Sequence, residues 1–173
     1  MSLVNILEDQ NDSFARYKMP EFEIRTKNKI TYVMNLINVS KALKINPLYI
    51  VKYIGQSVST KSRYDEKTNE WQLNGIHDKR ILMINLRKFI KECILCSKCG
   101  LPELDYKIVK NVLLYQICRA CSCSYKCPFN GIFKYIHQIE SQLNDKDNKI
   151  NKEIELLDDI ESIANKIDSF DEW

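Results

Sequence analysis

Alternating apolar and polar residues in the first half of the chain predict a β-hairpin. Residues 21–25 and residues 30–36 alternate in this way and are rich in β-branched and aromatic side chains, which favour strands. The polar segment Thr-Lys-Asn-Lys between them is typical of a turn. A second pair of strands is expected on either side of residues 66–69, ended by the Asn-Gly dipeptide at residues 74–75.

Three helices are expected between and after these strands. Asn38 is the predicted N-cap of a short helix that ends at Leu43, and Asn46 followed by a proline predicts the start of the next helix. Residues 77–94 predict a third helix packed on the sheet through its apolar positions Ile81, Ile84, Leu86, Phe89, Ile90 and Cys93. Residues 1–19 show little periodicity and are expected to form an extended or partly ordered N-terminal arm.

Two Cys-x-x-Cys motifs are the most specific pattern in the second half of the chain. They are Cys96/Cys99 and Cys118/Cys121, with 18 residues between them. Four thiolates at this spacing can bind one zinc ion tetrahedrally, and the intervening turn residues and alternating apolar residues predict the hairpins of a zinc ribbon. The alternatives are four buried thiols in an ordinary core and a redox motif, and no βαβ pattern supports the redox motif.

Three further cysteines lie close to these motifs. Cys93 falls in the third predicted helix and is expected to be a small buried hydrophobe. Cys123 and Cys127 follow the second motif, and Cys123 is the main rival of Cys121 as the fourth ligand. Seven cysteines with no secretory signal favour metal-bound thiolates in a reducing compartment over a disulfide framework.

Charge divides the chain into a basic body and an acidic end. Residues 145–173 hold ten acidic and four basic residues, and residues 1–144 carry a net charge of +9 although the whole chain carries only +3. A basic body favours a polyanionic partner such as RNA, and an acidic segment favours a basic protein partner. Apolar residues at helical spacing predict that residues 131–173 are largely helical.

Several classes of protein do not fit this sequence. No apolar run approaches the length of a membrane span. An independent enzyme is not expected, because His77 and His137 are isolated, no glycine-rich phosphate loop is present, and four cysteines on zinc leave no open catalytic position. The predicted fold is α+β, with a small antiparallel sheet and packed helices, a four-cysteine zinc ribbon and a helical acidic tail. The expected divisions are an arm at 1–19, an α/β domain at 20–93, the ribbon at 94–130 and the extension at 131–173.

Five motifs in order resemble the N-terminal domain of eukaryotic translation initiation factor 5. They occupy residues 14–20, 46–55, 74–78, 88–103 and 118–121, within a resemblance that covers about residues 13–127. The β-subunit of initiation factor 2 is similar to the same α/β and zinc-ribbon unit. It lacks the Arg-Tyr-Lys-Met-Pro segment that begins here at residue 16, so the resemblance to factor 5 is stronger.

The resemblance implies stimulation of GTP hydrolysis by initiation factor 2 on the scanning small ribosomal subunit. The activating arginine of the family matches Arg16, which is therefore the expected arginine finger. Lys52 matches a family lysine implicated in activation, and Lys18 is a weaker candidate. The implied partners are GTP-bound initiation factor 2 with initiator tRNA, the small subunit, other initiation factors and RNA. A cytoplasmic monomer with structural zinc is expected.

The chain also departs from the family pattern. The family's lysine after the first hairpin turn aligns with Ile30, so Lys27 or Lys29 is required in its place. Ser122 replaces the glycine that follows the second cysteine motif. The family's C-terminal helical-repeat domain is not expected here, and the acidic tail is expected to substitute partly for it by docking on an initiation factor or on the basic body. A tail that merely caps the domain is the alternative.

Two other functions stay open on the sequence. One is a non-catalytic module that binds the ribosome or initiation factors at the same site. The other is a diverged β-subunit of initiation factor 2, although the lysine-rich blocks expected of that protein do not occur here.

Overall fold

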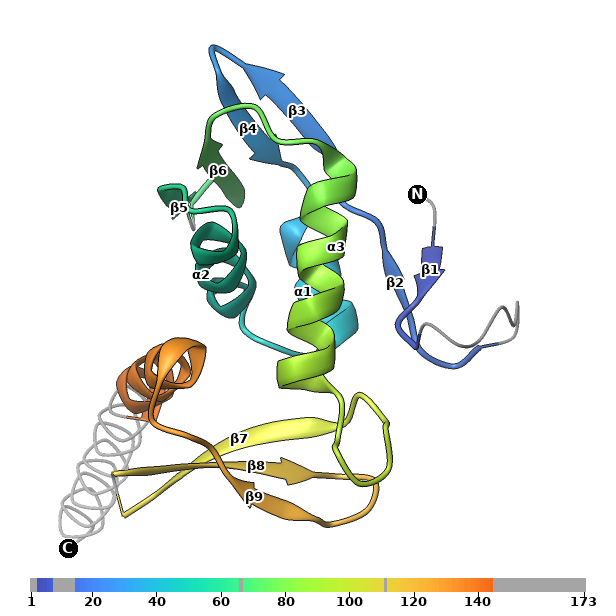
Figure 1. Cartoon of the computed structure of the whole chain (residues 1–173), viewed down its shortest axis with the longest axis vertical. Helices are drawn as coiled ribbons and strands as arrows, with labels where there is room; N and C mark the ends of the chain where they lie inside the picture. Colours follow the sequence, from blue (N-terminus) through green and yellow to red (C-terminus); the bar gives the residue numbers. More distant parts are fainter. Residues whose placement is uncertain (1–2, 8–14, 66, 111, 145–173) are drawn as a thin grey trace, which may run out of the picture.

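The computed structural model describes residues 3–7, 15–65, 67–110 and 112–144. Within them, a four-stranded sheet and three helices form the upper part of the molecule, and a three-stranded ribbon lies below (Figure 1). This arrangement confirms the predicted α+β class. Residues 145–173, the greater part of the predicted acidic helix, lie outside the described residues.

Both predicted hairpins are confirmed, and they build one antiparallel sheet of order β3-β4-β6-β5. The strands are β3 (Ile24–Lys27), β4 (Ile30–Val33), β5 (Ser62–Asp65) and β6 (Glu70–Asn74). Asn28 and Lys29 form the turn between β3 and β4 with φ of 51° and 59°. A two-residue turn with positive φ at both central residues has a twist that matches the twist of the flanking strands. The turn is therefore shorter than expected, and Lys27 belongs to a strand.

Helices cover the sheet, as the sequence predicts. They are α1 (Leu36–Leu43), α2 (Pro47–Ser57) and α3 (Lys79–Phe89), and α3 continues into the π-helical turn η1 (Ile90–Ile94). The predicted start of α2 is confirmed, because the side chain of Asn46 accepts a hydrogen bond of 2.9 Å from the N–H of Leu48. Asp78 caps α3 in the same way through the N–H of Arg80, at 2.7 Å.

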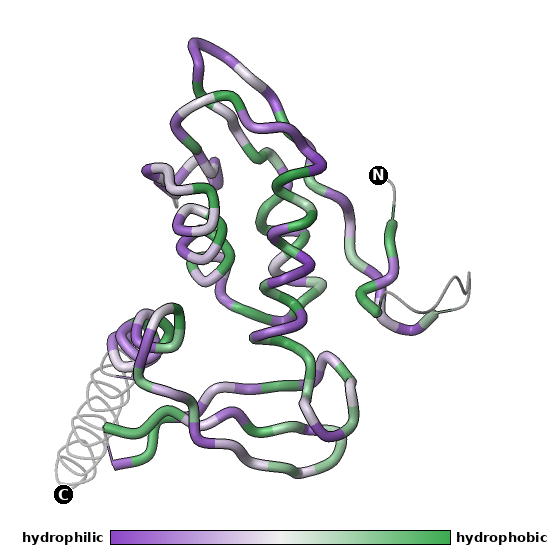
Figure 2. The backbone as a smooth tube through the Cα atoms, in the orientation of Figure 1, coloured by the Kyte–Doolittle hydropathy of each residue, from purple (hydrophilic) through white to green (hydrophobic). Residues whose placement is uncertain are grey.

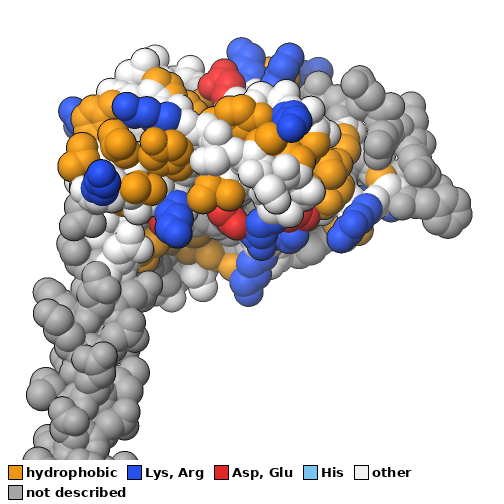
Figure 3. Space-filling view, turned by 90° about the horizontal axis from the view of Figure 1, so that it is seen from below, with side chains coloured by type: hydrophobic (Ala, Val, Ile, Leu, Met, Phe, Trp, Pro, Cys, Tyr) orange, Lys and Arg blue, Asp and Glu red, His pale blue; other side chains and the backbone are white. Residues whose placement is uncertain are grey.

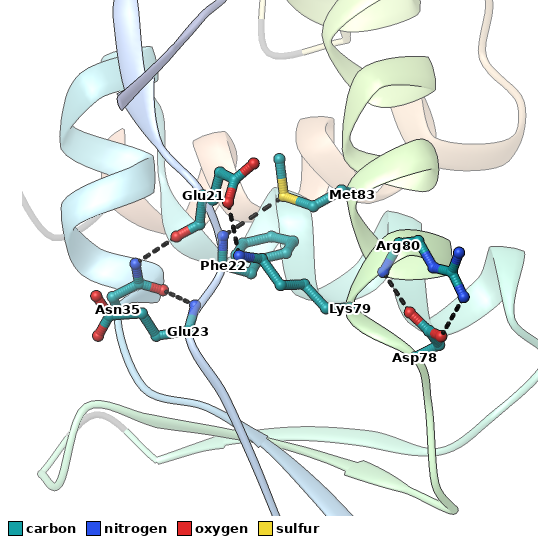
Figure 4. Close-up of polar contacts among 8 residues, drawn as sticks. All are labelled: Glu21, Phe22, Glu23, Asn35, Asp78, Lys79, Arg80 and Met83. Carbon is teal, nitrogen blue, oxygen red and sulfur yellow. Dashed lines mark hydrogen bonds and ion pairs between the residues drawn. The ribbon is translucent and has the colours of Figure 1, made fainter. Parts of the chain in front are cut away.

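The predicted start of α1 is wrong by three residues. The N-cap position is Asn35, not Asn38, which lies exposed within the helix. Asn35 is buried and does not cap the helix with its side chain. Its amide donates to the carbonyl of Glu21 at 2.7 Å and accepts from the N–H of Glu23 at 2.9 Å (Figure 4). A tertiary contact, which local sequence does not reveal, therefore fixes this helix end.

The segment between the arm and the sheet is held from both sides. Phe22 is fully buried and meets Trp71 edge to face, with ring centres 5.8 Å apart. Its N–H points at the sulfur of Met83 on α3, and the ammonium of Lys79 contacts the carboxylate of Glu21 at 2.6 Å (Figure 4). Residues 21–23 thus join α1 and α3 and fix where the arm leaves the body.

The expected packing face of α3 is partly wrong. Leu82, Leu86 and Phe89 are completely buried, whereas Ile81 and Ile84 are 50% and 56% exposed. The buried residues recur at helical spacing, and each isoleucine points away from that face. Hydrophilic and hydrophobic turns alternate along this helix in Figure 2. A second apolar stripe on the helix is therefore left on the surface.

The described part of the arm pairs with itself. Strand β1 (Leu3–Asn5) runs antiparallel to β2 (Lys18–Pro20), and Ile6 and Met19 are buried. The guanidinium of Arg87 on α3 donates to the carbonyl of Asn5 at 2.7 Å. Residues 18–20 are therefore a fixed base from which the chain reaches residue 16.

The ribbon contains β7 (Leu104–Val109), β8 (Leu113–Cys118) and β9 (Ser124–Lys126) in that order. It docks on the body through Tyr106, whose hydroxyl donates to the carbonyl of Cys93 at 2.9 Å and whose ring meets Tyr49 edge to face. Residues 131–144 form a further helix beside α2, and the buried hydroxyl of Tyr49 donates to the carboxylate of Glu140 on it. Among the described residues, no helix is long and apolar enough to cross a membrane.

Candidate functional site

The structure brings together the four cysteines of the two predicted motifs. Their Sγ atoms all lie within 4.8 Å of one another, and Cys96–Cys121 and Cys99–Cys118 are each separated by 3.6 Å. A tetrahedral tetrathiolate site with metal–sulfur bonds of about 2.3 Å has sulfur–sulfur edges of about 3.8 Å. The cluster therefore has the size and the donor set to hold one metal ion.

The same backbone turn follows the first cysteine of each motif. The carbonyl of Cys96 accepts from the N–H of Gly100 at 2.8 Å, and the carbonyl of Cys118 accepts from the N–H of Ser122 at 2.9 Å. Gly100 and Ser122 have φ of 71° and 56°. Ser122 therefore adopts the left-handed conformation that glycine adopts without strain in the first turn. The second turn therefore forms with serine at the position where the first turn has glycine.

The electrostatics of Cys96 favour a metal ligand. Burial disfavours the thiolate, but hydrogen bonds from the backbone N–H groups of Cys99 and Lys98 and from neighbouring thiols outweigh that effect and lower the pKa of Cys96 to about 6. Backbone hydrogen bonds also favour the thiolates of Cys99 and Cys121, but burial and hydrogen bonds among the thiols outweigh them and raise the pKa of both. Because the thiolate is the form that binds a metal, the thiol of Cys96 is prepared for ligation.

The other three cysteines lie elsewhere. Burial raises the pKa of Cys93 to about 12 and that of Cys127 to about 11, so both are neutral core thiols. This confirms the interpretation of Cys93 as a buried hydrophobe.

Cys123 is not part of the four-sulfur cluster, although the effect of burial on its thiol is outweighed by contacts with Cys121 and Lys98, which lower its pKa. Its carbonyl accepts from the N–H of Cys118 at 2.9 Å. The geometry therefore favours Cys121 over Cys123 as the fourth ligand.

Arg16 is exposed, two residues before β2. The carbon of its guanidinium lies 5.5 Å from the ring centre of Tyr17, a loose cation–π contact. Tyr17 itself packs partly on the core, and its carbonyl accepts from the N–H of Ile6 at 3.0 Å. An exposed guanidinium thus lies directly beside an anchored backbone.

Lys52 lies on α2, half-buried, and faces the helix of residues 131–144. Its ammonium lies 4.6 Å from the ring centre of Tyr135. Sequence reasoning missed this pairing, since no local pattern links two residues 83 positions apart. Tyr135 resembles any other aromatic on an amphipathic helix.

The structure does not gather the basic candidates into one site. The arm with Arg16 and the helix with Lys52 lie on opposite sides of α1 and α3 (Figure 1). Lys27 and Lys29 are exposed at the tip of the β3–β4 hairpin, at the end of the molecule away from the ribbon. Three separate elements therefore present these cations.

The lower face of the molecule offers a mixed surface. Figure 3 shows hydrophobic and basic side chains interspersed over this face, with few acidic ones. Where the ribbon meets the helix of residues 131–144, a hollow of about 620 Å³ is lined by apolar residues that include Leu114, Phe129 and Phe133. Phe129 is 66% exposed at its rim.

A family model described as the domain found in initiation factors 2B and 5 matches residues 7–124. This chain belongs to that domain family. A probable eukaryotic translation initiation factor 5-2 of Arabidopsis thaliana is 37% identical over 126 residues, which are 70% of this chain and 29% of the relative. Initiation factor 5 of Caenorhabditis elegans is 33% identical over 126 residues, which are again 70% of this chain and 29% of the relative. The mouse factor 5 is 33% identical over 123 residues, 68% of this chain and 29% of its own.

These relatives confirm the resemblance to the N-terminal domain of initiation factor 5. The chain spans about 29% of the length of the curated relatives it matches. The segment matched by the family model includes Arg16, Lys52 and the four clustered cysteines, whereas Tyr135 lies beyond it.

Proposed function

We propose that this domain accelerates GTP hydrolysis by initiation factor 2 during start-codon selection, with Arg16 as an arginine finger. The observation that carries the proposal is the exposed guanidinium of Arg16 on a backbone anchored through Tyr17 and β2. A finger needs both properties, because it must enter the partner's site and arrive there in a fixed register. Membership of the family supports the same assignment.

Phosphoryl transfer explains why an arginine is suited to this role. Negative charge spreads over the γ-phosphoryl oxygens in the transition state, and a planar guanidinium neutralises it with two parallel donors. Such a finger accelerates hydrolysis by roughly 10³–10⁵, which corresponds to about 4–7 kcal/mol of barrier. The loose contact of Arg16 with Tyr17 is worth only about 0.5–1 kcal/mol, so releasing it costs little by comparison. The domain acts in trans and needs no nucleotide site of its own.

Lys52 is proposed as a supporting cation, with Lys18 a weaker candidate. The ammonium of Lys52 contacts the ring of Tyr135, so Lys52 must leave that ring before it can reach a partner. Arg16 and Lys52 therefore contact different parts of initiation factor 2, or act at different stages.

Zinc is proposed as the structural ion of the four-cysteine cluster, since tetrahedral thiolate sites with no open position are typical of structural zinc. When bound, it can contribute roughly 10–16 kcal/mol of apparent binding free energy to the folding of such a module. The cluster fixes the turn that leads to Glu103, whose carboxylate binds Lys44 at 3.0 Å. The metal thereby also supports the contact between ribbon and body.

The proposed partners are GTP-bound initiation factor 2 with initiator tRNA, the small ribosomal subunit and other initiation factors, in the cytoplasm. A non-catalytic module that occupies the same site is the second candidate. It is favoured by the dispersal of Arg16, Lys52 and the hairpin lysines over three elements.

The two candidates differ in what Arg16 does. For an activator, Arg16→Ala abolishes stimulated GTP hydrolysis and leaves the affinity for initiation factor 2 unchanged, since the finger acts mainly in the transition state. For a binding module, neither the wild type nor Arg16→Ala stimulates GTP hydrolysis. Arg80→Ala is the matched control, because Arg80 is an exposed arginine on α3.

A further inference from the structure

A basic groove lies at the edge of the sheet, between α2, β5 and the helix of residues 131–144. Its volume is about 820 Å³, and three cations, Lys52, Lys61 and Arg63, lie in its lining. Among the described residues, none that lines the groove is acidic; the others are Val51, Gly55, Gln56, Ser59, Thr60, Ser62, Gln72, Asn74 and Tyr135. The groove is therefore a concentrated positive surface with many uncharged hydrogen-bonding groups.

Backbone and side-chain contacts hold the walls of this groove in place. The hydroxyl of Thr60 donates to the carbonyl of Asn74 at 2.7 Å, and that of Ser62 donates to the carbonyl of Val51 at 3.1 Å. The helix and the strand approach closely at Gly55, where a Cβ atom would lie only 2.4 Å from the hydroxyl of Ser62. The concave shape is thus a property of the packed fold.

Two of the three cations of the groove are available to meet a ligand. Lys61 and Arg63 are exposed, and within the described part of the chain neither forms an ion pair. Arg63 pairs across the strands with Gln72, so the two side chains project from the same face of the sheet. Lys52 is held over Tyr135 at the opposite wall.

We propose that this groove binds the phosphodiester backbone of RNA. Contacts to phosphate and ribose come mainly from Arg and Lys together with Ser, Thr, Asn, Gln and Tyr side chains, which is the composition of this lining. An acidic amphipathic peptide needs apolar pockets for its hydrophobic face, and in this lining only Val51 and Tyr135 carry apolar or aromatic side chains. Lys52 is also proposed to support GTPase activation, whereas RNA contact through Lys61 and Arg63 does not require initiation factor 2.

The test uses a labelled 12-nucleotide oligouridylate, the full chain and fluorescence anisotropy across a range of salt concentrations. Each phosphate neutralised on a single strand contributes about 0.7 to the slope of log affinity against log salt. The double variant Lys61→Ala/Arg63→Ala is expected to lower that slope by about 1.4. Arg80→Ala/Lys91→Ala removes the same charge from exposed positions on α3 and η1 and is expected to leave the slope unchanged.

Three results would overturn the proposal. They are no binding of the oligouridylate by the wild type, an equal loss of slope in both double variants, and stronger competition by polyglutamate than by unlabelled RNA. Gln72→Glu provides a second variant that keeps the shape of the residue and places a carboxylate in the groove. It is expected to weaken RNA binding about tenfold, by reversing part of the positive field that attracts phosphate, and unchanged affinity would also contradict the proposal.

Discussion

The ammonium of Lys52 on α2 lies 4.6 Å from the ring centre of Tyr135, so a helix beyond the ribbon covers the lysine proposed to support activation. A cation–π contact of this kind is worth about 0.5–1 kcal/mol at a partly exposed site. Releasing Lys52 must cost that free energy whenever it contacts a partner.

Removing the ring is therefore expected to help activation. Tyr135→Leu should raise the stimulated rate of GTP hydrolysis by about two- to fivefold, which is the equivalent of about 0.5–1 kcal/mol. Tyr135→Phe keeps the aromatic face and should behave as the wild type. Single-turnover hydrolysis with both variants measures the effect, and equal rates for Leu and Phe would show that the contact does not restrain Lys52. Thermal melting of both variants checks that the helix still packs.

Metal binding should separate Cys121 from Cys123. Cys121→Ser is expected to reduce bound zinc well below one ion per chain, because three thiolates leave the tetrahedron incomplete. Cys123→Ser is expected to keep about one zinc, since its sulfur lies outside the cluster. Elemental analysis of the purified proteins decides between them, and loss of zinc from Cys123→Ser would reverse the assignment.

The turns that follow Cys96 and Cys118 predict that exchanging glycine and serine has opposite effects on stability at the two positions. Ser122→Gly should stabilise the protein by about 1 kcal/mol, because the left-handed conformation at φ 56° is strained for serine. Gly100→Ser should destabilise it by a similar amount through the backbone alone, since no atom of the described residues lies within 4 Å of an added Cβ atom. Chemical denaturation of the zinc-bound protein measures both. If the two substitutions shift stability in the same direction, backbone strain is not the cause.

Asn35 and Asn38 test the corrected start of α1. Asn35→Ala leaves the carbonyl of Glu21 and the N–H of Glu23 without their partner and should cost about 2–3 kcal/mol of unfolding free energy. Asn38→Ala changes an exposed position inside a helix and should be neutral or slightly stabilising. Urea denaturation of each variant gives the comparison. A larger loss at Asn38 would restore that residue as the functional cap.

Local chemistry explains which parts of the fold were predictable. The cap and proline at residues 46–47 fix the start of α2, and the spacing of the two cysteine pairs fixes the four-sulfur cluster. Each signal depends on residues close in sequence or on a ligand geometry that allows few arrangements. For the same reason the hairpins of the sheet followed from alternation and turn residues alone.

The remaining features depend on contacts between distant segments. Helix α3 carries two apolar stripes, and only packing against α2 and the sheet shows that Leu82 is buried and Ile81 is not. Asn35 resembles an ordinary polar residue until the backbone of residues 21–23 is placed beside it. The contact between Lys52 and Tyr135 requires the ribbon to bring a later helix against α2. Periodicity alone contains none of these relationships.

Single-turnover GTP hydrolysis tests the role of Arg16 most directly. The substrate is initiation factor 2 bound to GTP and initiator tRNA on small ribosomal subunits, with wild-type protein, Arg16→Ala or Arg80→Ala added. We expect wild type and Arg80→Ala to stimulate hydrolysis equally, and Arg16→Ala to lower the stimulated rate by roughly 10³-fold or more while binding with unchanged affinity. Stimulation by Arg16→Ala equal to that of wild type, or no stimulation by wild type, would contradict the assignment of Arg16 as the finger.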